Sequence, residues 1–204
     1  MPARDKISGL MQRRDKSRLD EEEIEVVLMN INEAVLVFTK DIYYISLACA
    51  KKLVQFHSDK VVLDKEYGSI IREFDYLFIH IVDRYASGIC SEDVKENFIE
   101  KLGLSVINAR INDCAEGMDN NLIEEARSYE IDCLNKRNIE YAKYKKLYAD
   151  KGEGTKNTLF WEFGKKIVLD CLHSLNPAEI VYCASIGSDI ITNVKIEKVL
   201  EEII

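Results

Sequence analysis

The chain has 204 residues, of which 47% are apolar and 31% are charged, and its net charge is −8. This balance supports a sizeable core and excludes the composition typical of intrinsically disordered chains. Only 2 prolines and 9 glycines interrupt the sequence, which argues against long linkers and against a strand-rich fold. We therefore expect an all-α fold, with a single helical domain over residues 19–204.

The N-terminal segment is basic. Residues 1–18 carry six arginines and lysines against two aspartates, a net charge of +4, whereas the remainder carries −12. We expect a flexible arm that can touch phosphates or an anionic surface, although the acidic remainder argues against nucleic acid as a partner. There is no signal-peptide pattern and no uncharged stretch of roughly 20 residues, so we expect a cytoplasmic protein without a membrane span.

The six cysteines stand singly, with neither a C-x-x-C pair nor a histidine at zinc-site spacing. Cysteine on an apolar helical stripe behaves as a small hydrophobic residue, as we expect for Cys49 and Cys171. The pattern predicts reduced core thiols and gives no reason to expect a metal or a cofactor.

A long helix is predicted over residues 20–57, on the order of 57 Å at about 1.5 Å per residue. Its apolar residues recur in alternating steps of four and three, which is a heptad stripe. The stripe comprises Ile24, Leu28, Ile31, Val35, Phe38, Ile42, Ile45, Cys49 and Phe56. A second apolar row comprises Met29, Leu36, Tyr43, Leu47, Ala50 and Val54. We therefore expect this helix to pack on more than one side and to organise a bundle of about six helices.

The later helices follow from apolar spacing and capping residues. The second runs over residues 67–85 and ends near Gly88, and the third begins after Ser91, with an interruption or kink expected at Gly103. A fourth is expected from Asp119 or Asn120 to about residue 150, followed by a loop at 151–156. The fifth covers about 160–175, and the sixth starts at Pro177. We expect residues 178–204 to be helical, with a split at Gly187 and Ser188 and a strand over residues 187–196 as alternatives.

The most polar helical face lies on the second helix. Glu73, Tyr76, His80, Asp83 and Arg84 fall three, four or seven residues from His80 and so share one face. A histidine beside carboxylates can act as a general base or bind a metal. The sequence lacks the Glu-x-x-His motifs of di-iron bundles, however. The alternative, which we favour, is that these side chains form ion pairs and polar contacts between helices. His57 and His173 fit positions at helix ends.

Residues 135–156 interleave seven lysines and arginines with Tyr141, Tyr144 and Tyr148. Basic residues with aromatic rings can bind single-stranded nucleic acid. The tyrosine spacing fits better a packing seam on the fourth helix, with the basic residues facing solvent. The glycines at 152 and 154 do not have the spacing of a phosphate-binding loop.

No catalytic motif is present, and three hypotheses for function remain. The first is a non-catalytic helical interaction or scaffold domain that either binds a protein partner or associates with itself as a homo-oligomer. The second is a bundle that binds a metal or small ligand at the polar face around His80, as an enzyme or otherwise. The third is weak electrostatic binding to nucleic acid or a membrane surface through the basic segments.

Overall fold

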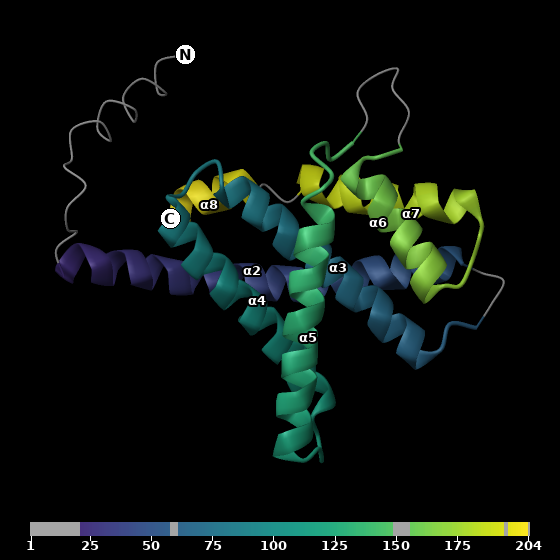
Figure 1. The fold of residues 1–204 in the computed structure, drawn as a ribbon, viewed down its shortest axis with the longest axis horizontal. Helices are drawn as coiled ribbons and strands as arrows, with labels where there is room; N and C mark the ends of the chain where they lie inside the picture. Colours follow the sequence, from purple (N-terminus) through teal and green to yellow (C-terminus); the bar gives the residue numbers. More distant parts are fainter. Residues whose placement is uncertain (1–20, 58–60, 149–155, 194–195, 204) are drawn as a thin grey trace.

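The computed structural model describes residues 21–57, 61–148, 156–193 and 196–203. Within them the chain is all-α, as predicted, and forms no strand (Figure 1). The helices are α2 (Glu21–Phe56), α3 (Asp64–Ala86), α4 (Glu92–Cys114), α5 (Asn120–Tyr141), α6 (Leu159–Lys166), the π-helical stretch η1 (Ile167–Cys171), α7 (Pro177–Asn193) and α8 (Ile196–Ile203). The predicted arm, residues 1–18, and most of the predicted loop at 151–156 lie outside the described residues.

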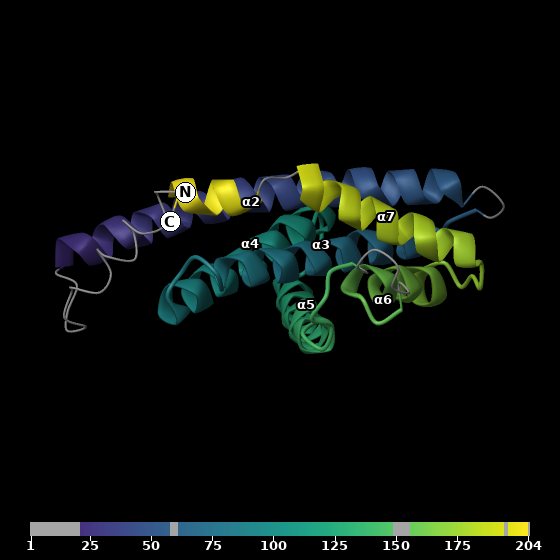
Figure 2. The same cartoon turned by 90° about the horizontal axis from the view of Figure 1, so that it is seen from above.

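Figure 2 shows three layers. The first contains α2, with α7 and α8 running alongside it; the second contains α3, α4 and α6; the third is α5. The long helix was predicted almost to the residue, and its heptad stripe from Ile31 to Cys49 faces the core. The second row is only partly covered, because Leu36 is 69% exposed. Helix α2 therefore packs against α3 and α4 and also against α7 and α8, and its middle keeps an exposed outer face.

Helix α3 runs through the centre of the molecule, and every residue from Glu73 to Val82 is buried. Its start is fixed by the Glu66 carboxylate, which accepts a hydrogen bond from the backbone N–H of Leu63 at 2.9 Å. Its end was predicted near Gly88, and the chain leaves the helix at Ser87 with right-handed backbone angles. The left-handed glycine cap that Gly88 suggested is not used.

Two predictions for the third and fourth helices are wrong. Gly103 does not interrupt α4; a Cβ at this position would lie 2.9 Å from the Leu134 side chain of α5, so the glycine permits close helix packing. The Asp119 carboxylate caps α5 as predicted, accepting from the N–H of Asn121 at 2.7 Å. Helix α5 ends at Tyr141, however, and not near residue 150.

The C-terminal third is helical, so the strand alternative for residues 187–196 is wrong wherever the structure describes them. Gly187 does not split α7: it is buried, and a Cβ there would lie 2.9 Å from the Phe160 ring. Gly164 brings α6 against α7 so closely that a Cβ would lie 2.6 Å from the Ile180 carbonyl oxygen. Both glycines therefore mark close helix contacts, and the expected split at Gly187 does not occur.

The buried apolar side chains form one cluster that draws on every helix from α2 to α8. Phe74 of α3 packs edge-to-face on Phe163 of α6 at 5.0 Å between ring centroids, and Phe38 of α2 does the same with Phe98 of α4 at 5.9 Å. Among the described helices, none is both long enough and apolar enough to cross a bilayer.

Candidate functional site

The polar face predicted on α3 lies against α5. Glu73 is buried and forms a bidentate ion pair with Arg137, with O···N distances of 2.6 and 2.7 Å. The Tyr141 hydroxyl donates to the same carboxylate at 3.2 Å, and Arg137 also reaches Glu140 at 2.7 Å. Burial raises the pKa of Tyr141 well above its usual value, so the phenol stays protonated.

A second contact lies beside the first, where Glu130 of α5, two turns before Arg137, binds two residues of α3. The Tyr76 hydroxyl donates to one Glu130 oxygen at 2.5 Å, and Arg72 binds the other at 2.7 Å. Burial and the Glu130 carboxylate both raise the pKa of Tyr76. We name this set of contacts the α3–α5 ionic seam: Arg72, Glu73, Tyr76, Glu130, Arg137 and Tyr141.

His80 lies at the end of the ionic seam, with its ring centroid 5.6 Å from that of Tyr141. It is 3% exposed, and neither ring nitrogen makes a hydrogen bond of acceptable geometry. Burial and the charge of Arg84 lower the pKa of His80 to about 4, although the Asn138 side chain acts in the opposite direction. His80 is therefore a neutral imidazole at neutral pH.

Asp83 and Arg84, the last two residues of the predicted face, lie at its half-buried edge. The Asp83 carboxylate is 4.0 Å from Lys95 of α4, and Arg84 donates to the backbone carbonyl of Tyr144. The five predicted residues thus share one helical face, but Glu73 and Tyr76 are engaged by α5, Asp83 by α4 and Arg84 by the chain after α5. They do not converge on a common point.

Sequence reasoning missed the partners of these residues and two further buried pairs. Asp75 of α3 forms a bidentate pair with Arg110 of α4 at 2.8 and 2.9 Å, and Arg110 lies over the Tyr43 ring of α2 at 4.1 Å. His57, predicted as an end-of-helix residue, also binds Glu179 of α7 at 2.6 Å. These partners are 35 to 122 residues apart, so no local spacing could reveal them.

Arg137 corrects the interpretation of the basic stretch at 135–156, because its side chain is mostly covered and paired with Glu73 in the ionic seam. The tyrosine seam is only partly correct as well. Tyr141 is buried in α5, whereas Tyr144 and Tyr148 follow the helix, and Tyr148 stacks on Phe160 at 5.5 Å. The lysines at 143, 145, 146 and 156 are exposed, as predicted.

The chemistry available at these positions is limited. No group of three or more histidine, cysteine, aspartate and glutamate side chains is arranged to hold a metal ion in the described part of the chain. Burial raises the pKa of both Cys49 and Cys171 to about 12, so these thiols stay protonated and act as core residues. Cys114, by contrast, is exposed, so the expectation that all the cysteines are core residues is wrong.

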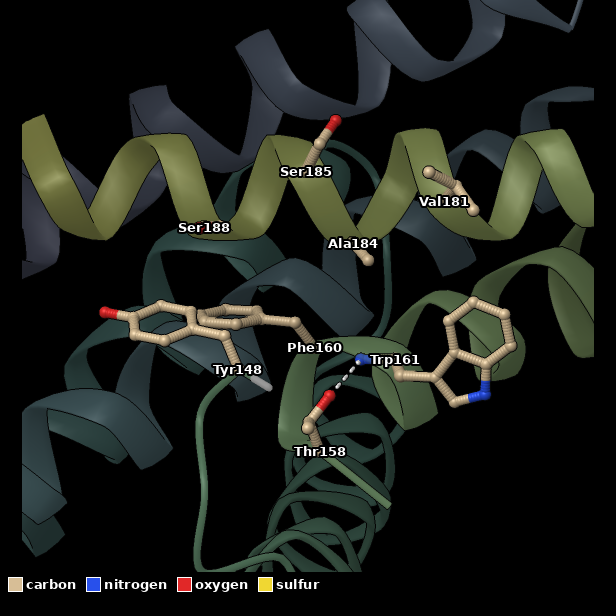
Figure 3. Close-up of a pocket in the computed structure, with 8 residues that line it drawn as sticks. All are labelled: Tyr148, Thr158, Phe160, Trp161, Val181, Ala184, Ser185 and Ser188. Atoms are coloured by element: carbon tan, nitrogen blue, oxygen red, sulfur yellow. Dashed lines mark hydrogen bonds between the residues drawn. The ribbon is translucent and has the colours of Figure 1, made fainter. Parts of the chain in front are cut away.

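A pocket of about 220 Å³ lies on a different part of the surface, between α6 and α7 (Figure 3). Its walls are mainly the rings of Tyr148, Phe160 and Trp161 and the side chains of Val181 and Ala184. The Ser185 hydroxyl points away from these rings and donates to the Tyr182 carbonyl at 2.8 Å. The backbone N–H of Trp161 donates to the Thr158 hydroxyl at 3.4 Å, and this contact caps α6. None of the lining residues belongs to α3.

Comparison with known proteins yields no relative: no protein-family model, no curated protein and no solved structure matches the chain. The function must therefore be inferred from the geometry of the chain itself.

Proposed function

We propose that this chain is a non-catalytic helical interaction domain that pairs with a second copy of itself through the outer face of α2. The observation that carries this proposal is a run of exposed residues on the middle of that helix. Leu36 is 69% exposed, Val37 40% and Tyr44 60%, with the exposed charges of Lys40 and Asp41 between them. Scattered single apolar residues are usual on a monomer, whereas three exposed apolar side chains close together on one helix, flanking a lysine and an aspartate, are typical of an interface.

The charges on this face favour a second copy as the partner. Two copies related by a two-fold axis bring residue i of one helix to residue j of the other and residue j to residue i. If two α2 helices lie antiparallel with the axis between residues 40 and 41, each Lys40 meets the partner's Asp41. The same register places Val37 against the partner's Tyr44. Glu33 then lies near the partner's Lys51 and Lys52, so the charged pairs across the contact are opposite in sign.

The polar face around His80 supports the alternative hypothesis less well. Glu73 is paired with Arg137, Asp83 lies near Lys95, Arg84 donates to the Tyr144 carbonyl, and the pocket lies elsewhere. Buried charges need such partners even in a protein without a catalytic site. Contacts that hold neighbouring segments against α3 account for Glu73, Tyr76, Asp83 and Arg84. They do not account for the two buried His80 nitrogens, which have no hydrogen-bond partner.

Charge reversal tests the pairing directly in sedimentation equilibrium of the full chain. We expect a dimer for the wild type, and monomers for Lys40→Asp and for Asp41→Lys, because each variant alone places like charges across the axis. An equimolar mixture of the two variants restores both opposite-charge pairs and should form a heterodimer. Leu122→Asp, which changes an exposed apolar residue of α5, is the matched control and should leave the dimer intact.

A wild-type chain that stays monomeric at high concentration would contradict the proposal. A failure of the two single variants to associate when mixed would also contradict it, because the antiparallel register predicts that the mixture restores both opposite-charge pairs.

A further inference from the structure

We propose that the pocket between α6 and α7 binds one large apolar side chain of an acidic peptide segment from a partner protein. This site is separate from the outer face of α2. Five of its eight lining residues are aromatic or aliphatic, and the other three are Thr158, Ser185 and Ser188. Three rings from one side face Val181 and Ala184 from the other (Figure 3).

The size of the pocket favours a single side chain. An apolar cavity of about 150 Å³ accepts benzene, whereas sites for whole small-molecule ligands measure roughly 300–1,000 Å³. At about 220 Å³ the pocket matches a phenylalanine or leucine side chain inserted from outside. Pockets of this kind receive the anchor residues that dominate the affinity of protein interfaces.

The surrounding charge selects the partner. The described residues 143–148 and 156–166 contain six lysines and one carboxylate, so they are basic within a chain of net charge −8. Lys145 and Lys156 are exposed, and lie three and two residues from the lining residues Tyr148 and Thr158. Lys165 lies one turn after Trp161 and is paired with Glu162. Asp189, next to Ser188, is the carboxylate on the α7 side. A peptide with acidic residues flanking its anchor therefore complements this rim.

The chain itself does not offer a good occupant. Residues 149–155, which adjoin Tyr148 in sequence, contain no apolar side chain larger than alanine. Residues 1–18 contain isoleucine, leucine and methionine, but their net charge of +4 matches the sign of the lysine rim. Like charges across an interface disfavour association.

Trp161 is the only tryptophan in the chain, so its fluorescence reports directly on the pocket. The probe is a ten-residue peptide with one phenylalanine among aspartates and glutamates, added to the full chain at physiological salt. We expect a saturable change in Trp161 emission. Replacing the peptide's phenylalanine by alanine should weaken binding about tenfold or more, because the loss of a buried aromatic side chain is worth at least that factor.

Protein variants provide the matched controls. Val181→Asp places a carboxylate in the wall of the pocket and should abolish the response, whereas Leu175→Asp, at an exposed apolar residue outside the pocket, should retain it. Lys145→Glu combined with Lys156→Glu should weaken binding about tenfold, and Lys136→Glu on α5 should not. The dimer expected through α2 should survive all of these changes, so the two proposals fail independently.

Several outcomes would overturn the inference. One is no fluorescence change with any peptide. Another is equal binding of the alanine peptide, which would make the contact purely electrostatic. Stronger binding of a lysine-rich analogue would assign the pocket to a basic segment such as residues 1–18. An equal response to N-acetyl-phenylalanine amide would assign it to a small apolar ligand.

Discussion

Helix α3 meets its neighbours in two different ways. Towards α6 it presents Phe74, which packs on Phe163 in a contact between aromatic rings. Towards α5 it presents the ionic seam, in which Glu73 binds Arg137 and Tyr76 binds Glu130. Helix α5 buries only Leu134 and Tyr141, so it has little apolar surface to contribute. The apolar contact supplies stability, whereas the ionic seam fixes where α5 lies and adds little net free energy.

The largest effect should come from the apolar side. Phe74→Ala removes a fully buried ring, and we expect the free energy of unfolding to fall by about 3–5 kcal/mol. Urea denaturation followed by circular dichroism measures this loss. Tyr129→Ala, at an exposed tyrosine of α5, is the control and should change stability by less than about 0.5 kcal/mol. A loss below 1 kcal/mol for Phe74→Ala would mean that the apolar contact is not what holds α3 in place.

The ionic seam should respond to single and double changes in opposite ways. Arg137→Met leaves the Glu73 carboxylate buried without its main partner, and we expect a loss of about 2–3 kcal/mol. This is below the value for a fully buried pair because the Arg137 side chain is 19% exposed. The double variant Glu73→Leu with Arg137→Met removes both charges and should return to within about 1 kcal/mol of the wild type.

Hydrogen exchange distinguishes a local from a global effect of Arg137→Met. Amides of α5 should exchange faster in the single variant, while those of α2 change only by the global loss of stability. A double variant as unstable as the single one would show that the ionic seam contributes net stability after all.

The smallest effect is a pH dependence at the end of the ionic seam. Since the pKa of folded His80 is lowered to about 4, the unfolded chain binds this proton more readily, and stability falls as the pH drops from about 6.5 towards 4. Between pH 7 and pH 5 the loss should be about 2 kcal/mol. His80→Leu should remove most of this slope.

Glu179 provides the internal comparison, because its pKa is lowered in the folded chain. Its contribution to the free energy of unfolding is therefore lost only below the ordinary glutamate pKa of 4.5. Its loss therefore falls in a more acidic range than that of His80. If stability still falls as steeply between pH 7 and pH 5 in His80→Leu, the group that titrates is not His80.

The sequence determined the helices because their signals are local. The heptad stripe predicted α2, the carboxylate of Asp119 predicted the start of α5, and Pro177 predicted the start of α7. The same spacing placed Glu73, Tyr76, His80, Asp83 and Arg84 on one face of α3, which the structure retains. Periodicity of 3.6 residues is a property of a single helix and needs no knowledge of its neighbours.

Only the tertiary structure decided what these residues touch. Arg137 looked like one of several solvated basic residues, yet it pairs with Glu73 from 64 residues away. Gly103 and Gly187 looked like breaks, yet each permits a neighbouring side chain to approach more closely than a Cβ would allow, and Gly164 does the same for the backbone of α7. The pocket likewise brings together Tyr148, which lies between α5 and α6, and Val181 of α7. A sequence records which side chains share a face, whereas the partner across that face depends on how the helices pack, and packing is set by contacts between residues far apart in the chain.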